Sequence, residues 1–348
     1  MKNIFKIVLV IVGAFIGAGF ASGKEIYTFF YIFGTKGIIG LIISSMLLIM
    51  VIYKTLSIIS KNDIYNYKEF LDYLIKDDKD KYGYIKSIIN NIVNILILIS
   101  FFIMVAGFGA YFKQEFNVSS IVGSAILAIL SYIILNQDTK GLVKTNEILV
   151  PIIIAVIIII GIICIEPQYL TININTHTAE KSNFLLNSIL YCSYNCMLLI
   201  PVLITMKNYI KNKKTVFLIS FISGIVILLL SFIMFFILNS NIEDMTNVEL
   251  PVLYILKNNL LLKNIYGIII LVSIFTTAIS LGSGFMKNIT KSKKSYPQIA
   301  KIMCIIAVFV SQIGFSNLVN YLYPIFGYIG ILQIIKLFMP RLEKIKKN

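Results

Sequence analysis

The sequence predicts an all-α membrane protein whose chain crosses the bilayer several times. Of its 348 residues, 58% are hydrophobic and only 14% are charged, and the mean hydropathy is +0.89. That is more apolar surface than one soluble core can bury. Apolar runs long enough to cross a hydrocarbon layer of about 30 Å recur along the whole chain. Stretches such as 150–165 are apolar on every side, which excludes the alternating strands of a transmembrane β-barrel.

Ten apolar spans are predicted between charged residues or Pro and Gly punctuation. They cover residues 4–33, 36–59, 87–112, 117–135, 141–165, 183–206, 215–238, 264–286, 297–314 and 317–338. With the N-terminus inside, six basic residues fall outside, which leaves 25 of the 31 Lys and Arg residues inside; the six are Lys24, Lys36, Lys113, Lys181, Lys257 and Lys263. The positive-inside rule therefore predicts that both termini are cytoplasmic.

Three segments need separate interpretation. Lys2 and Lys6 stand ahead of an apolar stretch as in a secretory signal, but removal of this segment would break the charge asymmetry, so we expect it to stay as the first helix. Between residues 61 and 86, aromatic and aliphatic residues among charges predict a short amphipathic helix at the cytoplasmic surface. Pro251 is expected to open a second short helix, over 252–262, on the outside.

Enzyme chemistry has no visible site in this sequence. The only histidine, His177, lies in a polar loop, and the cysteines at 164, 192, 196 and 304 form no Cys-x-x-Cys pair, so no triad or transition-metal site is predicted. The net charge of +15 comes from short clusters without interleaved stacking aromatics, which argues against a nucleic-acid partner. We therefore expect no enzymatic activity and no organic cofactor.

The first span carries a glycine cluster near its midpoint, in the run Gly13-Ala-Phe-Ile-Gly17-Ala-Gly19-Phe-Ala-Ser-Gly23. Because glycine costs about 1 kcal/mol relative to alanine inside a helix, the cluster marks either a close-packing face or a break. Both four-residue spacings, 13 to 17 and 19 to 23, fit a packing motif. Gly17 and Gly19 lie on different faces, however, which favours a break. An unwound segment would present free carbonyls to a cation and a helix N-terminus to an anion.

The eighth span carries a stripe of hydroxyl side chains. Its members lie at i, i+3, i+4 and i+7 and are Ser273, Thr276, Thr277 and Ser280. Neutral hydroxyl oxygens are hard ligands that suit a monovalent cation such as Na⁺. The alternative is that they hydrogen-bond to carbonyls of their own helix or to neighbouring helices.

The sixth span combines polar residues and a proline. Asn195 needs hydrogen-bond partners at membrane depth, and Pro201 removes one helical hydrogen bond, so local unwinding of this span is predicted. Pro151 and Pro324, in the fifth and tenth spans, are interpreted as simple kinks.

Two acidic residues are candidates for proton coupling. Glu25 follows the glycine cluster and Glu147 precedes Pro151. A carboxylate at membrane depth is a candidate functional group. Each could instead reach a membrane interface, Glu25 on the outside and Glu147 on the inside.

These motifs together resemble the bacterial YkvI-type membrane proteins. Gly-Ala-Gly-Phe-Ala-Ser-Gly-x-Glu at 17–25 is the most specific part, and Ser-Tyr-Asn at 193–195, Thr-Thr-Ala-Ile-Ser at 276–280 and Tyr-Pro-x-x-Gly-Tyr-x-Gly at 323–330 fit the same family. The similarity covers essentially the whole chain. That family resembles a branch of the amino acid–polyamine–organocation (APC) superfamily, whose members share the LeuT-type fold of two inverted five-helix repeats.

The resemblance implies one transporter domain over residues 1–348, with repeats at about 4–165 and 183–338 and facing breaks in the first and sixth spans. It implies a Na⁺ site built from the carbonyls of Gly13, Ile16 and Ser273 and the hydroxyls of Thr276 and Thr277. The solute is expected to contact a set of residues from both breaks, namely Gly17, Ala18, Gly19, Phe20, Ser193, Tyr194 and Asn195. The sequence departs from the family pattern at one point. No arginine lies at the outer end of the first span and no acid lies on the tenth, so the two residues that would form a charged outer gate are missing.

The resulting hypothesis is a multi-pass secondary transporter of the bacterial plasma membrane, a symporter that couples Na⁺ to a small amine or amino-acid-like solute by alternating access. Two alternatives remain open: proton coupling through Glu25 or Glu147, and a ligand sensor or receptor subunit that does not transport. The expected partners are the solute and the lipid bilayer, and a homo-oligomer is compatible with the sequence.

Overall fold

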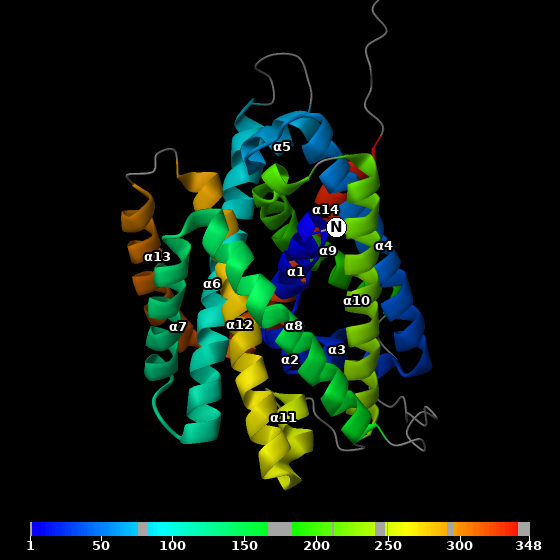
Figure 1. Ribbon diagram of the computed structural model, residues 1–348, viewed down its shortest axis with the longest axis vertical. Coiled ribbons are helices and arrows are strands. Elements are labelled where there is room, and N and C mark those ends of the chain that lie inside the picture. Colours follow the sequence, from blue (N-terminus) through cyan, green and yellow to red (C-terminus); the bar gives the residue numbers. More distant parts are fainter. Residues whose placement is uncertain are drawn as a thin grey trace, which may run out of the picture.

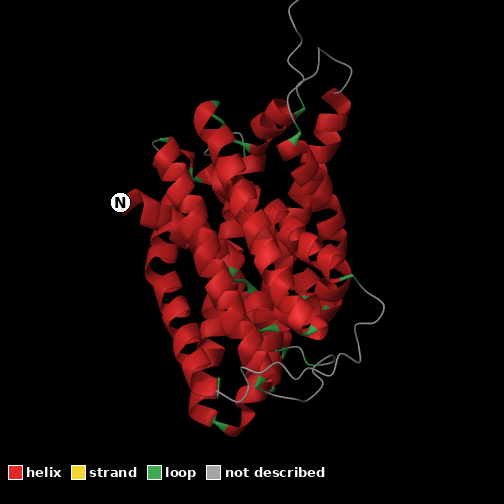
Figure 2. Ribbon diagram, turned by 90° about the vertical axis from the view of Figure 1, so that its right-hand side faces the viewer, coloured by secondary structure: helices red, strands yellow, loops and turns green. Residues whose placement is uncertain are grey.

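The computed structural model describes residues 2–75, 83–165, 183–210, 212–240, 248, 250–290 and 295–339, and all regular elements in these ranges are helices (Figures 1 and 2). The long helices are α1 (Lys2–Phe15), α4 (Thr35–Lys61), α6 (Gly83–Phe116), α7 (Ser120–Leu135), α8 (Asp138–Cys164), α9 (Phe184–Thr205), α10 (Lys213–Asn239), α12 (Leu260–Ile289), α13 (Tyr296–Val310) and α14 (Phe315–Phe338). The short ones are α2 (Ala18–Ala21), α3 (Lys24–Phe29), η1 (Tyr31–Phe33), α5 (Tyr67–Leu74), η3 (Lys207–Tyr209), α11 (Pro251–Ile255), η4 (Leu256–Asn258) and η5 (Ser311–Ile313).

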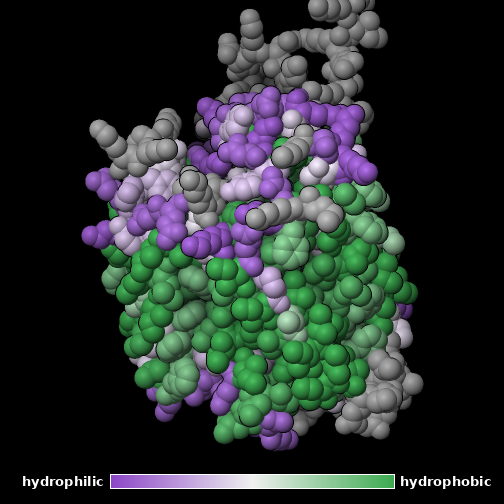
Figure 3. Space-filling model, viewed as in Figure 1, coloured by the Kyte–Doolittle hydropathy of each residue, from purple (hydrophilic) through white to green (hydrophobic). Residues whose placement is uncertain are grey.

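The helices form a bundle with the surface of a membrane protein. Among the described residues, seven helices are long and apolar enough to cross a bilayer, and α1, α7 and the end of α14 supply three shorter apolar helices. Large apolar side chains such as Ile162 and Phe309 are 75% and 72% exposed on the outer surface, as contact with lipid requires. Figure 3 shows a broad apolar belt, with hydrophilic residues gathered at the end that carries α5.

Each of the ten predicted apolar spans falls on a helix or a run of helices, and the first falls on the interrupted series α1, α2, α3 and η1. At the centre of the bundle, α1 packs against α8, α10 and α12, while α9 packs between α4 and α14. The pair α7 and α13 lies on one side of Figure 1, and α4 and α10 lie on the other.

The two short helices predicted between spans differ in outcome. The amphipathic helix predicted within 61–86 is α5, which buries Tyr67, Phe70 and Leu71. The helix predicted over 252–262 is wrong in its extent, because α11 ends at Ile255. The Asn259 side chain accepts a hydrogen bond from the Leu262 N–H at 3.1 Å and so caps the start of α12.

The predicted break in the sixth span is not present. Helix α9 is continuous from Phe184 to Thr205, with Pro201 inside it. No glycine interrupts this helix, and the polar side chains hydrogen-bond along it: Ser193 Oγ donates to the Ile189 carbonyl at 2.6 Å and Asn195 Nδ2 to the Tyr191 carbonyl at 3.0 Å. Removal of one N–H by the proline therefore does not unwind the segment.

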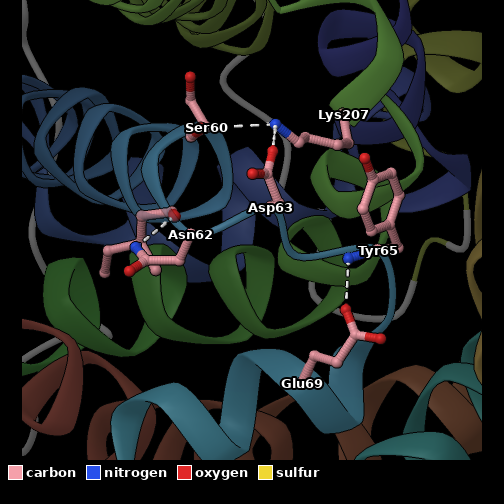
Figure 4. A network of polar contacts seen from close by, with 7 residues as sticks. Ser60, Asn62, Asp63, Tyr65, Glu69 and Lys207 are labelled. Carbon is pink, nitrogen blue, oxygen red and sulfur yellow. Dashed lines mark hydrogen bonds and ion pairs between the residues drawn. The ribbon is translucent and has the colours of Figure 1, made fainter.

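A polar network joins the ends of α4 and α9 at the hydrophilic end of the bundle. The Lys207 ammonium lies 2.8 Å from an Asp63 carboxylate oxygen and donates to the Ser60 carbonyl at 3.4 Å (Figure 4). The nearby Tyr65 N–H donates to the Glu69 carboxylate at 2.7 Å. Because the Asp63 side chain is 75% exposed, solvent screens this ion pair, and it contributes little to the stability of the protein.

Candidate functional site

The first apolar span is broken where the glycine cluster predicts a break. Helix α1 ends at Phe15, Gly17 has extended backbone angles (φ −88°, ψ −168°), and α2 starts at Ala18. A second turn follows at Gly23, whose φ of +83° favours glycine. Since the Gly17 N–H donates to the Phe15 carbonyl, the Gly13 carbonyl loses the donor that a continuous helix would give it.

Hydroxyl groups of α12 reach the carbonyls freed at this break. Thr277 Oγ1 donates to the Gly13 carbonyl at 2.8 Å and to the Ile16 carbonyl at 3.1 Å. Thr276 Oγ1 lies 3.4 Å from the Gly13 oxygen and 3.0 Å from the Ser273 oxygen. The structure therefore brings together all five groups that the family resemblance implies for a cation site. The fourth residue of the hydroxyl stripe, Ser280, instead donates to the Thr276 carbonyl of its own helix at 2.8 Å.

Asn146 of α8 lies directly against this cluster and was missed by the sequence reasoning. Its side chain is fully buried, and its Nδ2 donates to the Leu142 carbonyl at 2.9 Å. Its Oδ1 has no hydrogen-bond partner in the described structure and would lie only 1.9 Å from a Cβ built on Gly13. A buried acceptor without a donor is costly. The amide one residue before Glu147, in the polar run at the start of this span, was the available sequence signal.

Glu25 lies inside the bundle, so the alternative that it reaches the outer interface is wrong. It is 4% exposed. Its carboxylate accepts hydrogen bonds from the Tyr194 hydroxyl of α9 and from the Phe20 N–H. The side chain folds back over Gly19, where a Cβ would lie 2.2 Å from Oε1. Within the described residues it forms no ion pair with a basic side chain.

Aromatic rings cluster around Tyr194, whose hydroxyl donates to Glu25. The Tyr194 ring stacks on Tyr323 with centroids 4.8 Å apart and on Phe29 at 5.7 Å. Tyr191 meets Tyr194 edge-on at 5.5 Å and Phe30 at 4.8 Å. The Tyr191 hydroxyl is buried and has no hydrogen-bond partner in the part of the chain described. Burial of a phenol without a partner is unfavourable, as it is for the Asn146 amide.

The remaining residues assigned to the solute do not all meet. Gly17 faces Thr277, and Ala18 packs against Gly107 of α6. Phe20 is buried edge-on to Phe15 at 5.7 Å. The Ser193 carbonyl faces Gly330 of α14, so of the three α9 residues Tyr194 is the one whose hydrogen bond reaches the broken first helix.

The second candidate acid, Glu147 of α8, is partly exposed and pairs with a lysine. Its Oε2 is 3.2 Å from the Lys6 ammonium of α1, and the two side chains are 31% and 23% exposed. This position agrees with the alternative in which Glu147 reaches an interface. It is separate from the cluster around Glu25, with which it shares no hydrogen bond or ion pair among the described residues.

Comparison with known proteins agrees with this architecture. The Bacillus subtilis (strain 168) membrane protein YkvI, which is uncharacterized, is 28% identical over 340 residues, which cover 94% of this chain and 92% of YkvI. The chain is a homologue of YkvI. The uncharacterized YyaD of the same organism is 24% identical, with 98% of each chain covered. No protein-family model matches the chain.

Solved structures of similar shape are LeuT-fold proteins. MhsT in complex with L-phenylalanine aligns with a TM-score of 0.69 at 15% identity, covering 94% of this chain and 87% of MhsT. A substrate-bound, outward-open Na⁺-coupled sialic acid symporter aligns at 0.66 and 14% identity, covering 96% and 79%. An Eremococcus coleocola manganese transporter aligns at 0.57 and 13% identity, covering 95% and 75%. This chain thus has a LeuT-type fold, and its structural neighbours are transporters rather than enzymes.

Proposed function

We propose that this protein is a secondary transporter that couples Na⁺ to the movement of a small amine or amino-acid-like solute. The observation that carries the proposal is the contact of the Thr277 hydroxyl with the Gly13 and Ile16 carbonyls at 2.8 and 3.1 Å. Helices α1 and α12, which are distant in sequence, therefore bring neutral oxygen atoms together at the break that follows α1. The similarity to a Na⁺-coupled symporter supports this function.

The chemistry of the oxygen cluster suits Na⁺. The three carbonyls and two hydroxyls are neutral, and in the part of the chain that the structure describes no carboxylate takes part in their hydrogen bonds. A divalent cation would favour carboxylate ligands. Neutral oxygens bind a monovalent ion weakly enough that it can be released. A hydroxyl hydrogen can rotate away, so each threonine oxygen can turn a lone pair toward an ion.

The architecture supports alternating access between two inverted repeats of five helices, ten spans in all. In this arrangement α1 to α8 form the first repeat, and α9 to α14 form the second. Contacts within one repeat have counterparts in the other, since α1 packs on α8 as α9 packs on α14. Contacts between the repeats are matched too, since α1 packs on α10 as α9 packs on α4. Na⁺ bound between α1 and α12 would favour one of the two access states through its differential affinity. We place the termini in the cytoplasm of a bacterial cell, with α5 on that side of the plasma membrane.

The test is charge movement in proteoliposomes adsorbed on a solid-supported membrane. Amines and amino acids are applied first under a Na⁺ gradient and then under a proton gradient alone. We expect a solute current that requires Na⁺ and that disappears in the Thr276→Ala/Thr277→Ala double variant while the protein stays folded. Unchanged sodium dependence in that variant would remove the proposed cation site.

Proton coupling is the second candidate, because Glu25 is a buried carboxylate with no basic partner among the described residues. A solute current under the proton gradient alone that is lost in Glu25→Gln would favour it. Solute binding without any current, in protein shown to be folded, would instead favour a sensor built on a transporter fold.

A further inference from the structure

We propose that the solute site next to Glu25 recognises an organic ammonium ion that lacks a neighbouring carboxylate, with Glu25 as its charge partner and the rings of Tyr191, Tyr194 and Tyr323 around it. This inference rests on the proposed transport function and narrows its solute class. It excludes zwitterionic amino acids as the preferred solute.

The first argument is charge. A carboxylate that is 4% exposed has lost most of its hydration, and the two hydrogen bonds from Tyr194 and the Phe20 N–H replace only part of it. No described basic residue supplies the balancing charge. The neighbouring Lys24 directs its ammonium to the Val248 carbonyl at 2.9 Å. A cationic ligand would supply the missing charge.

The second argument is the surface that such a cation would meet. Phe29, Tyr194 and Tyr323 form one stack, and Tyr191 closes against Tyr194 at an interplanar angle of 84°. Ring faces attract ammonium groups within about 6 Å of their centroids. A bare metal ion prefers several oxygen ligands instead, and these rings offer few. The surroundings therefore fit a cation with N–H and alkyl surface.

The third argument is the unpaired Tyr191 hydroxyl. Tyr191 is 3% exposed, its oxygen has no hydrogen-bond partner in the described structure, and its ring lies 5.5 Å from that of Tyr194, which donates to Glu25. An ammonium group brings two or three N–H donors. One can be accepted by Glu25 and another by Tyr191, which would satisfy both buried acceptors.

The same geometry disfavours a zwitterion. The carboxylate of an α-amino acid lies two bonds from its nitrogen, so an ammonium held by Glu25 would place that carboxylate close to the Glu25 charge. Repulsion between two carboxylates in a buried site is strongly unfavourable, and such repulsion commonly discriminates against the wrong ligand.

The experiment measures binding to the purified full-length protein in detergent with saturating Na⁺, by calorimetry and thermal shift. The probes are ethylamine, n-butylamine and n-hexylamine, with norvaline as the zwitterion that matches butylamine and 1-butanol as its neutral analogue. We expect at least one amine to bind, and norvaline and butanol to bind about ten-fold more weakly or not at all. Equal or tighter binding of norvaline would overturn the proposal.

Two variants test the residues. Glu25→Gln should weaken amine binding about ten-fold or more, the loss typical of removing one member of a buried charge pair. Tyr191→Phe should weaken it several-fold without lowering the thermal stability of the solute-free protein, a combination that a purely structural role would not produce. The control is Glu115→Gln, since Glu115 pairs with Lys263 at 2.8 Å away from the site. Unchanged amine affinity in Glu25→Gln would refute the assignment.

The increase in thermal stability caused by Na⁺ alone is measured in parallel. It distinguishes failure of the ammonium site from failure of the sodium site. If all three amines fail to bind while Na⁺ still stabilises the wild type, the ammonium assignment fails and the cation site stands. If Na⁺ gives no stabilisation but the amines bind through Glu25, the sodium coupling fails and the ammonium site stands.

Discussion

The hydroxyl of Thr277 donates a hydrogen bond to the carbonyl of Gly13 at 2.8 Å, across 264 positions of sequence. This carbonyl has lost its helical donor because the chain departs from helical geometry at Gly17. The contact therefore joins the break in the first span to the hydroxyl stripe of α12. In the proposed transport cycle, Na⁺ takes the place of the hydroxyl hydrogen between these oxygens.

Replacing Thr277 with valine should selectively weaken Na⁺ binding. The substitution keeps the shape of the side chain and removes the oxygen that faces two carbonyls. We expect the Na⁺ concentration for half-maximal stabilisation to rise by about ten-fold or more, the range seen when groups beside a metal are removed. Thr205→Val is the matched control, because that hydroxyl donates only to the Val202 carbonyl of its own helix in the described structure. Equal effects of both variants would contradict the assignment.

Asn146→Leu should separate stability from Na⁺ affinity. The substitution removes a buried oxygen that has no donor in the described structure, so the Na⁺-free protein should be unchanged or more stable by about 1 kcal/mol. If this oxygen also faces the ion or its water, Na⁺ affinity should fall several-fold. Denaturation measured with and without Na⁺ tests both parts. A variant that loses stability equally under both conditions would indicate that Asn146 serves packing alone.

Gly330→Ala should destabilise the contact between α14 and α9. A Cβ at this position would lie 2.3 Å from the Ser193 carbonyl oxygen, a backbone atom that cannot move aside cheaply. We expect a loss of about 1–3 kcal/mol, as for other overpacked contacts. Gly284→Ala is the control, because its Cβ would meet Pro201 at an ordinary 3.4 Å. Thermal unfolding of the two variants should differ clearly, and equal stability would show that α14 shifts freely.

Glu147→Gln should leave solute transport and its pH dependence close to those of the wild type. The ion pair with Lys6 is 3.2 Å long and partly exposed, which is worth up to about 1 kcal/mol. A small loss of thermal stability that is screened by salt is therefore expected. Transport in proteoliposomes across a range of pH is the measurement. Loss of proton dependence in this variant would move proton coupling to Glu147.

Much of the fold follows from the sequence because the forces that place membrane helices act locally. Hydrophobicity over about 20 residues decides where a span lies, and each predicted span coincides with a helix or a run of helices. The break at Gly17 was also predictable, since clustered glycines weaken a helix wherever it packs. Local reasoning failed at Pro201, because a single missing N–H does not decide between a kink and a break.

The sequence by itself determined where the apolar spans lie, the break in the first span and the hydroxyl stripe of the eighth, whereas the five groups of the candidate cation cluster came from the family resemblance. Only the tertiary structure decided that Glu25 turns inward to Tyr194, that Asn146 covers Gly13 and that the Tyr191 hydroxyl is left without a described partner. The first two of these relationships join segments that are more than 100 residues apart. Their geometry depends on how the helices pack, and residue spacing within one helix carries no information about it.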